Sequence, residues 1–527
     1  MGSKNFKFNQ WLTVLSVLIL LIAYQNCSFG FNSQTDFGFS TDTPFDDVLT
    51  LDPHAPSSAT NPVTPPSRVL SINTNPENLI GTNYRVGPEQ DYENIGDVPW
   101  EELGEGDNVF IFHKLTPYYE KWVVNTSGSE DHPIKIIGVP SAEGELPVIS
   151  GQNATTRISL SYWNENRGLL KLGGANNSDN TPEYIIIENL ELRAARPPYS
   201  FIDDSGETVD YAMNAASFYI EKAAHITLRN CKIHDSGNGI FIGANDGATH
   251  DIMIEGNRIY DNGNVDSIYE HNNYSAAIDI TFQFNYFGPL RSGTRGSNLK
   301  DRSAGLVVRY NWIEGGNRQL DLVDAEDSSV LVDHSHYQST FVYGNVLYEP
   351  NDDGNSQMVH YGGDSGTFDD YRKGTLYFYN NTVVSARSGN TTFFRLSTND
   401  EHADIRNNIF YVEQPANRQA LLSEHGSINL SANYFKGSPQ NSFSNFDGLI
   451  TTNTEAPHII YSTPGFVDYD QQLFQLSSDS LLRGEGLSLH SDVTSAGFSL
   501  GHQYLMHQYG EDRPNDDFLD LGAFEFE

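Results

Sequence analysis

Cysteine is nearly absent from this chain of 527 residues, which contains only Cys27 and Cys231. Two cysteines placed so far apart provide no disulfide framework, so the fold must be stabilised by its hydrophobic core. Cys231 lies inside an apolar strand pattern, and we expect it to be a small buried residue.

Basic residues are also scarce, with 31 Lys and Arg against 69 Asp and Glu and a formal net charge of −38. So acidic a surface repels polyanions, which excludes nucleic acid as a general partner. Apolar residues at 38 % and charged residues at 19 % exclude a disordered chain and a membrane bundle. Methionine is rare and long helical periodicities are missing, whereas 45 Gly, 28 Tyr, 30 Phe and Asn-rich turns favour many short strands.

Residues 1–26 are typical of an export signal, with a basic start and an apolar run at 11–23 that is too short to span a bilayer. Residues 24–27, Tyr-Gln-Asn-Cys, resemble a bacterial lipobox, in which Cys27 is lipidated; Ser28 after it implies the outer membrane. The alternative is cleavage after Ser28 or Gly30, which gives a soluble secreted protein. Both alternatives predict export from a Gram-negative bacterium, and only the lipoprotein would be attached to a membrane, through the lipid on Cys27.

Residues 27–75 are rich in Ser, Thr, Asn, Asp and Pro and show no periodicity, which predicts a flexible tether. From residue 76 to 527 short apolar strands alternate with turns. The short strands at 106–111, 133–138 and 147–151 each adjoin a glycine turn, and no helical segment separates them. We expect residues 465–468, 474–476 and 521–526 to form the last coils and a closing strand.

A repeat runs through this region: a short apolar strand, an asparagine, one variable residue and another apolar residue. Seven asparagines occupy this slot: Asn257, Asn285, Asn311, Asn345, Asn381, Asn408 and Asn433. The steps between their successive positions are 28, 26, 34, 36, 27 and 25, and Cys231 fills the same slot one such step before Asn257. Short strands at this period indicate a solenoid whose coils climb about 4.8 Å each. The sequence therefore predicts an all-β, right-handed parallel β-helix, monomeric, with a ladder of stacked asparagine amides.

Several segments then resemble the opening coils of known parallel β-helix proteins: Gly-Pro at 87–88, Leu-Gly-Glu-Gly-Asp-Asn-Val at 103–109, and the strands at 133–138 and 147–151. Asp-Leu-Gly-Ala-Phe-Glu at 520–525 resembles their closing strand. The class includes pectate lyase-like and alginate or chondroitin lyase-like enzymes. The resemblance implies a polysaccharide-degrading enzyme, although hydrolases, epimerases and adhesins share the helix.

A basic island at 291–302 is unusual in so acidic a chain, and the asparagine repeat predicts how it is placed. Counting back eleven residues from successive asparagines gives Tyr274, Lys300 and His334, and counting back nine gives Arg302, His336 and Arg372. If coils stack in register, these residues form two neighbouring columns, with His271 in the same region.

This set of side chains suits β-elimination on a uronic-acid polymer, which needs a neutralised carboxylate, a base and an acid. Lys300 beside Arg302 would have its cationic form disfavoured and serve as the base. Arg302 or Arg372 would hold the substrate carboxylate, and Tyr274 or His271 would serve the leaving oxygen. The remaining candidates are the catalytic histidines His334 and His336, the substrate-binding or rim residues Arg291 and Arg295, and His360, which either lines the cleft or is satisfied by backbone.

An acidic run near this island offers oxygen ligands. Lyases that resemble pectate lyases bind Ca²⁺ through carboxylates, which suggests Asp321, Asp324 and Asp327 as metal ligands. Asp321 and Asp324 also suit the acid and base of an inverting glycosidase, and acidic runs are often plain solvated surface. The leading hypothesis is a lyase on an acidic polysaccharide. The alternatives are a glycoside hydrolase or C5-epimerase on the same scaffold, or a non-catalytic glycan binder or adhesin.

Overall fold

The computed structural model describes residues 80–157, 162–175, 179–351, 353–454, 456–514 and 518–526. The expected export signal, the lipidation site Cys27 and the tether at 27–75 lie outside the described residues. Within the described part, no helix is long and apolar enough to cross a membrane.

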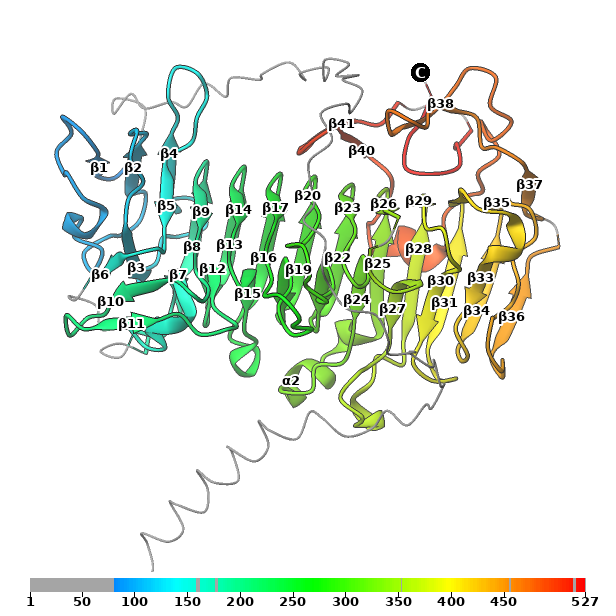
Figure 1. The fold of residues 1–527 in the computed structure, drawn as a ribbon, viewed down its shortest axis with the longest axis horizontal. Coiled ribbons are helices and arrows are strands. Elements are labelled where there is room, and N and C mark those ends of the chain that lie inside the picture. Colours follow the sequence, from blue (N-terminus) through cyan, green and yellow to red (C-terminus); the bar gives the residue numbers. More distant parts are fainter. Residues whose placement is uncertain are drawn as a thin grey trace, which may run out of the picture. The chain divides into compact units, whose positions relative to one another are not determined.

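The described chain forms an all-β, right-handed parallel β-helix built from three long sheets (Figure 1). The predicted fold class is therefore confirmed. The first sheet contains, in spatial order, β1 (Asn83–Val86), β2 (Asn108–Phe112), β4 (Ile134–Val139), β8 (Glu183–Glu188), β13 (Ala224–Arg229), β16 (His250–Glu255), β19 (Ile278–Gln283), β22 (Ala304–Arg309), β25 (Ser339–Tyr343), β28 (Thr375–Tyr379), β31 (His402–Arg406), β34 (Ser427–Ser431) and β36 (Leu449–Thr452).

The second sheet contains β11 (Thr208–Asp210), β10 (Ser200–Ile202), β6 (Ala154–Thr156), β3 (Glu120–Val124), β7 (Gly168–Leu172), β12 (Ala216–Ile220), β15 (Asn238–Ile242), β18 (Asn273–Ser275), β21 (Leu299–Asp301), β24 (Leu320–Leu322), β27 (Gln357–Tyr361), β30 (Thr391–Leu396) and β33 (Gln419–Leu422). The third contains β37 (Ile459–Tyr461), β35 (Tyr434–Lys436), β32 (Ile409–Val412), β29 (Thr382–Ser385), β26 (Val346–Glu349), β23 (Trp312–Glu314), β20 (Tyr286–Phe287), β17 (Arg258–Tyr260), β14 (Lys232–His234), β9 (Glu191–Arg193) and β5 (Val148–Ser150). All these pairings are parallel except β10 with β11.

The predicted asparagine ladder forms the bend between the first and third sheets. All seven asparagines are fully buried, and the amide Nδ2 of each of the first six donates to the Oδ1 of the next at 2.9–3.1 Å. The backbone N–H of buried Cys231 donates to Asn257 Oδ1 at 2.9 Å, so Cys231 occupies the expected slot. Each residue before a ladder asparagine has a positive φ, for example Tyr310 at 53°, which turns the chain at the bend. The ladder satisfies polar groups that the bend would otherwise bury unpaired.

Two insertions interrupt the second-to-first-sheet corner, and both protrude beside β24 and β27 (Figure 1). Lys300 precedes its ladder asparagine by eleven positions, whereas Asp321 precedes Asn345 by twenty-four and His360 precedes Asn381 by twenty-one. The extra residues form α2 (Ser329–Val332) and the 3₁₀ turn η5 (Ser335–Gln338) in one coil, and η6 (Phe368–Asp370) in the next.

The C-terminal region differs from the prediction. The described residues 466–514 and 518–526 add no coils and no closing strand. They form two antiparallel hairpins, β38 (Phe466–Asp468) with β39 (Leu473–Leu476) and β40 (His502–Leu505) with β41 (Tyr509–Asp512), and the short helix α3 (Ser491–Ser495). The tail packs on the outside of the solenoid, where aromatic side chains of the first and third sheets need cover. Trp312 stacks on Phe474 at 5.5 Å, and Tyr310 donates to the Ser499 carbonyl. The tail therefore packs along the outside of the β-helix, because it covers hydrophobic surface there.

Candidate functional site

Strand register places one column of polar side chains along the outer face of the second sheet. Tyr274, Lys300, Asp321, His360 and Arg395 pair in succession across β18, β21, β24, β27 and β30. Their strand neighbours, such as Leu320 and Leu322 on either side of Asp321, point into the core. Side chains alternate along a strand, so the polar column must face outward.

Lys300 lies at the centre of this column and makes two ion pairs. Its Nζ is 3.3 Å from Asp321 Oδ2 and also contacts Asp364 Oδ2. Burial lowers the pKa of Lys300, but the carboxylates of Asp321 and Asp364 outweigh burial and raise the pKa above its ordinary value. Arg302 disfavours the cationic form of Lys300 as expected, but the two carboxylates outweigh this effect on the pKa.

Arg302 is buried beside Lys300, and each of its three guanidinium nitrogens contacts an oxygen atom of another residue. Nε donates to Tyr274 Oη at 2.9 Å, and Nη1 donates to the Asp324 carbonyl. Nη2 lies 2.8 Å from Glu326 Oε1 and 2.9 Å from Asp364 Oδ1. These contacts fix the planar fork, and its acidic partners and Tyr274 keep the pKa of Arg302 raised despite burial.

Asp364 bridges the two cations. One carboxylate oxygen contacts the Lys300 ammonium and the other contacts the Arg302 guanidinium. Burial raises the pKa of Asp364, but Lys300 and Arg302 outweigh it and the pKa is lowered. The side chain is 33 % exposed and belongs to the loop after β27. Lys300 and Arg302 thus hold a carboxylate of their own chain between them.

Tyr274 completes the outward side of the cluster. Its pKa is raised by burial, and the nearby Arg302 and Lys300 offset part of this effect. Because Tyr274 Oη accepts from Arg302, its own proton is available for another acceptor. The structure thus brings Tyr274, Lys300 and Arg302 together as the sequence predicted.

Two buried histidines, His360 and His271, lie next to this cluster. His360 Nδ1 is 2.7 Å from Asp321 Oδ1 and Nε2 is 2.9 Å from Ser397 Oγ. Burial lowers the pKa of His360 to about 4, although Asp321 opposes the shift. This Ser–His–Asp order resembles a hydrolytic triad, but Ser397 Oγ also accepts from the Gly363 N–H at 2.9 Å and lies 2.9 Å from the Gly363 carbonyl. Its hydrogen-bonding capacity is therefore filled, and the three groups fix the column.

His271 is buried, and its Nδ1 accepts from the Ser297 N–H at 2.9 Å. Burial, followed by Lys300, lowers the pKa of His271 to about 3, so the ring is neutral near pH 7. The ring stacks on Tyr274 at 5.9 Å. His271 therefore lies beside Tyr274 and Lys300, in the region that the sequence predicted, and its buried ring positions Tyr274.

His334 and His336 do not join the column. They lie in the first insertion, where His334 caps η5 and His336 Nδ1 is 2.6 Å from Asp279 Oδ1. Counting back from the asparagines fails here because the added residues precede the ladder position; the true partners of Lys300 on the next coils are Asp321 and His360.

Arg372 is a structural residue and not a substrate-binding one. Its side chain and that of Asp301 are fully buried and pair at 3.1 Å, and Nε donates to the Val323 carbonyl at 2.6 Å. The guanidinium also lies over the Tyr337 ring. The pair closes the base of both insertions, so Arg372 cannot contact a polymer.

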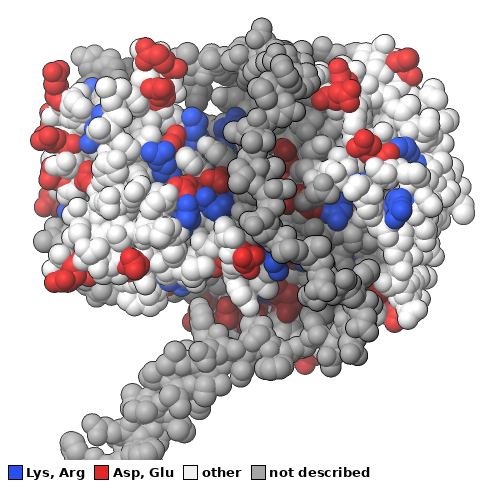
Figure 2. Space-filling view, in the orientation of Figure 1, with Lys and Arg blue, Asp and Glu red and all other residues white. Residues whose placement is uncertain are grey.

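Arg291 and Arg295 also lie away from the cluster. Arg291 pairs with Asp235 at 2.8 Å, next to the third sheet, and exposed Arg295 pairs with Asp266 at 3.3 Å. Figure 2 shows a separate gathering of Lys and Arg with acids among them over β9, β14 and β17. The basic island of the sequence is therefore divided between two faces.

The predicted calcium ligands do not converge. Asp321 is engaged by Lys300 and His360, while the fully buried carboxylate of Asp324 accepts from the Asp364 N–H and from Ser365. Asp327 is exposed. Among the described residues, the groups whose ligand atoms converge on a metal-sized site include none of the three. These residues do not fit a preformed Ca²⁺ site.

Asp364 and Arg395 are the residues that sequence reasoning missed. Arg395 sits one coil after His360, but the coils are offset by the insertions, so the period could not identify it. Asp364 lies in the second insertion, which has no counterpart in other coils. Only the Gly-Gly-Asp turn directly after β27 indicated a tight loop there.

No family model and no curated protein matches the sequence. Among solved structures, pectate lyase Pel9A is 13 % identical, with 85 % of this chain and 97 % of that chain covered and a TM-score of 0.39. An alginate lyase from Paenibacillus sp. str. FPU-7 is 13 % identical (67 % and 95 % covered, TM-score 0.37). A GH136 lacto-N-biosidase from Eubacterium ramulus is 12 % identical (73 % and 68 % covered, TM-score 0.40). At these identities the likeness concerns the fold and assigns no activity. The strand pairing of the chain itself makes it a right-handed parallel β-helix protein, with Tyr274, Lys300 and Arg302 clustered on its second sheet.

Proposed function

We propose that the chain is a polysaccharide lyase that cleaves a uronic-acid-containing polymer by β-elimination. One observation carries this proposal: Lys300 and Arg302 hold the Asp364 carboxylate between them, next to the Tyr274 hydroxyl. A uronate carboxylate has the same charge and planar shape. Asp364 lies on a partly exposed loop, and it would be displaced when a substrate carboxylate takes its place.

The cation pair would serve the reaction by stabilising charge. Removing the proton next to a carboxylate places negative charge on that group, and a preorganised guanidinium lowers the cost. Arg302 is held on three sides by Tyr274, Asp324 and Glu326, so it needs no reorganisation. The planar guanidinium of arginine stabilises a carboxylate better than the flexible ammonium of lysine does, because it can bind both carboxylate oxygens.

Proton transfer would use Lys300 and Tyr274. The neighbouring carboxylates raise the pKa of Lys300, so Lys300 serves as the base only in its neutral fraction, which grows as the pH rises toward that pKa. It then accepts the proton from the carbon next to the carboxylate, as the bond from the neighbouring carbon to the leaving oxygen breaks. Tyr274, protonated at neutral pH because its pKa is raised, donates to that oxygen. The same groups would serve a C5-epimerase if the proton returned to carbon.

A glycoside hydrolase needs one carboxyl group that stays protonated as the acid. The pKa values of Asp321 and Asp364 are both lowered, which removes them from that role. Glu326 has a pKa raised by burial and is the acid that the hydrolase alternative would use. Glu326→Gln would abolish a hydrolase, whereas a lyase would be weakened and not abolished, because Tyr274 and the Asp324 carbonyl still hold Arg302.

The test incubates the full chain with polygalacturonate, alginate and glycosaminoglycans, with and without Ca²⁺, and follows the ultraviolet absorbance of the unsaturated product. Lys300→Arg keeps the cation but cannot give up its proton, so we expect turnover to fall by at least about 100-fold with polymer binding retained. Tyr274→Phe should also lose turnover. Arg295→Gln is the matched control and should behave as wild type.

Each other outcome points to a different function. New reducing ends without the absorbance would indicate a hydrolase. Binding of the polymer without turnover under any condition would indicate a glycan binder or adhesin. Full activity in Lys300→Arg would remove Lys300 from proton transfer and overturn the assignment of the site.

A further inference from the structure

A second column of outward side chains runs along part of the first sheet, at a position that is skipped in the pairing of successive strands. Tyr184, His225, Asp251 and Asp279 are skipped in the pairing of β8, β13, β16 and β19, and each has a φ between 53° and 59°. Both strands of each pair skip one residue at the same place, so the register is kept and the skipped residues face one another. These four positions therefore form one column along the solenoid.

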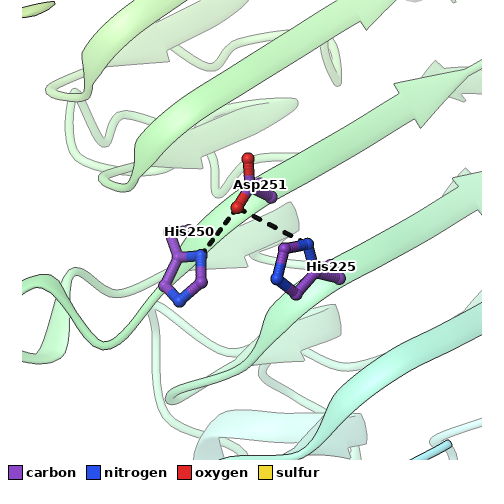
Figure 3. A group of neighbouring side chains, drawn as sticks. All are labelled: His225, His250 and Asp251. Atoms are coloured by element: carbon purple, nitrogen blue, oxygen red, sulfur yellow. Dashed lines mark hydrogen bonds and ion pairs between the residues drawn. The ribbon is translucent and has the colours of Figure 1, made fainter. Parts of the chain in front are cut away.

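Two histidines and one carboxylate converge in this column (Figure 3). Asp251 Oδ2 is 2.8 Å from His250 Nδ1 and 3.5 Å from His225 Nδ1, and all three ligand atoms lie within 4.8 Å of one another. The two imidazoles meet edge to face with centroids 5.2 Å apart. Both therefore direct the same kind of nitrogen toward one oxygen.

His225 is held in place by an aromatic ring on one of its faces. The Tyr184 ring stacks on His225 at 4.3 Å with an interplanar angle of 6°. The stack fixes the imidazole plane before any ligand arrives, which is the kind of support that metal-binding histidines require. The side chains of His225, His250 and Asp251 remain 33 %, 36 % and 48 % exposed, so an ion can reach them.

We propose that His225, His250 and Asp251 form a binding site for a divalent transition-metal ion of the Zn²⁺ class. Bonds of about 2.0–2.1 Å from a tetrahedral ion set its ligand atoms roughly 3.3 Å apart. The two measured separations, 2.8 and 3.5 Å, lie on either side of that value. Two imidazoles with one carboxylate favour Zn²⁺, Ni²⁺ or Cu²⁺, whereas Ca²⁺ prefers six or more oxygens.

Three protein ligands leave the fourth coordination position of a tetrahedral ion open, and a cavity beside the site has space for a further ligand. Asp251 also lines a cavity of about 730 Å³ between the first sheet and the C-terminal tail, together with Asp279, His336, Phe341, Tyr377 and Phe498. Sites with three protein ligands and an open position bind an exchangeable water or a ligand. The ion would thus stand at the edge of a cavity on the first sheet, whereas Lys300 and Arg302 belong to the second.

The test titrates the metal-free full chain with ZnCl₂ by isothermal calorimetry and repeats the titration with CaCl₂. We expect one Zn²⁺ per chain with a Kd near or below about 10 μM and no Ca²⁺ binding at that site. His225→Asn and Asp251→Asn each remove a ligand while keeping a residue type that tolerates positive φ. Either should weaken Zn²⁺ binding at least about 30-fold.

His425→Gln is the matched control, because His425 also pairs with an acid, Asp447 at 2.7 Å, but has no second imidazole there. It should bind Zn²⁺ as the wild type does. Circular dichroism and the melting temperature of each metal-free variant establish that it is folded. Absence of Zn²⁺ binding by the wild type, or equal binding by the wild type, His225→Asn and Asp251→Asn, would overturn the proposal. Equal weakening by His425→Gln would do the same.

Discussion

Asp364 provides the sharpest test of the anion site, because a substrate carboxylate must displace it. Two unit charges about 4 Å apart attract by about 1 kcal/mol in water and by about 4 kcal/mol at an effective dielectric near 20. Lys300 and Arg302 are buried, but the Asp364 side chain is 33 % exposed, so screening keeps the energy toward the lower end. We take about 1.4–2.8 kcal/mol for the displacement, which corresponds to about 10- to 100-fold in affinity.

Asp364→Asn should therefore lower KM on the cleaved polymer by about 10- to 100-fold. Initial rates from product absorbance across polymer concentrations measure this change, and direct binding calorimetry checks that KM follows affinity. The matched control is Asp266→Asn, which removes an exposed acid paired with Arg295 and should leave KM unchanged. A KM for Asp364→Asn that is equal to or above the wild-type value, in a folded protein, would refute the proposal that Asp364 occupies the position of the substrate carboxylate.

The same variant changes the pH profile. A lysine base works only when neutral, so kcat/KM, which reports the free enzyme, should rise with pH toward the raised pKa of Lys300. Removing the Asp364 carboxylate takes away one group that raises this pKa, so the rising limb should move to lower pH. A limb that stays in place or moves upward would show that another group titrates.

The remaining predictions concern what holds the site in place. Arg372→Met leaves the fully buried Asp301 carboxylate unpaired and should cost about 3–5 kcal/mol of unfolding free energy, with faster proteolysis of both insertions; a loss below about 1 kcal/mol would restore a functional role for Arg372. Asn345→Ala removes the amide that serves Val308, Tyr343 and Asn381 and should cost about 3 kcal/mol or more, read from the denaturation midpoint.

The period of the sequence was enough to predict the parallel β-helix, the asparagine ladder and the pairing of Tyr274 with Lys300. These features depend on positions that recur from coil to coil, and each follows from local rules: strands alternate, the bend needs a turn, and a buried amide needs a partner one coil away. Cys231 could be placed for the same reason, because it fills a repeated slot.

The tertiary structure decided what lies next to Lys300. Asp364 reaches the cluster from an insertion, Asp321 and His360 replace His334 and His336 as its neighbours, and Arg372 turns inward to pair with Asp301. No periodic pattern records these contacts, since insertions of different length shift the coils that follow them. The protonation state of Lys300 was also beyond the sequence, because it depends on two carboxylates located 21 and 64 residues away along the chain. Charge acts through space, and only the fold sets those distances.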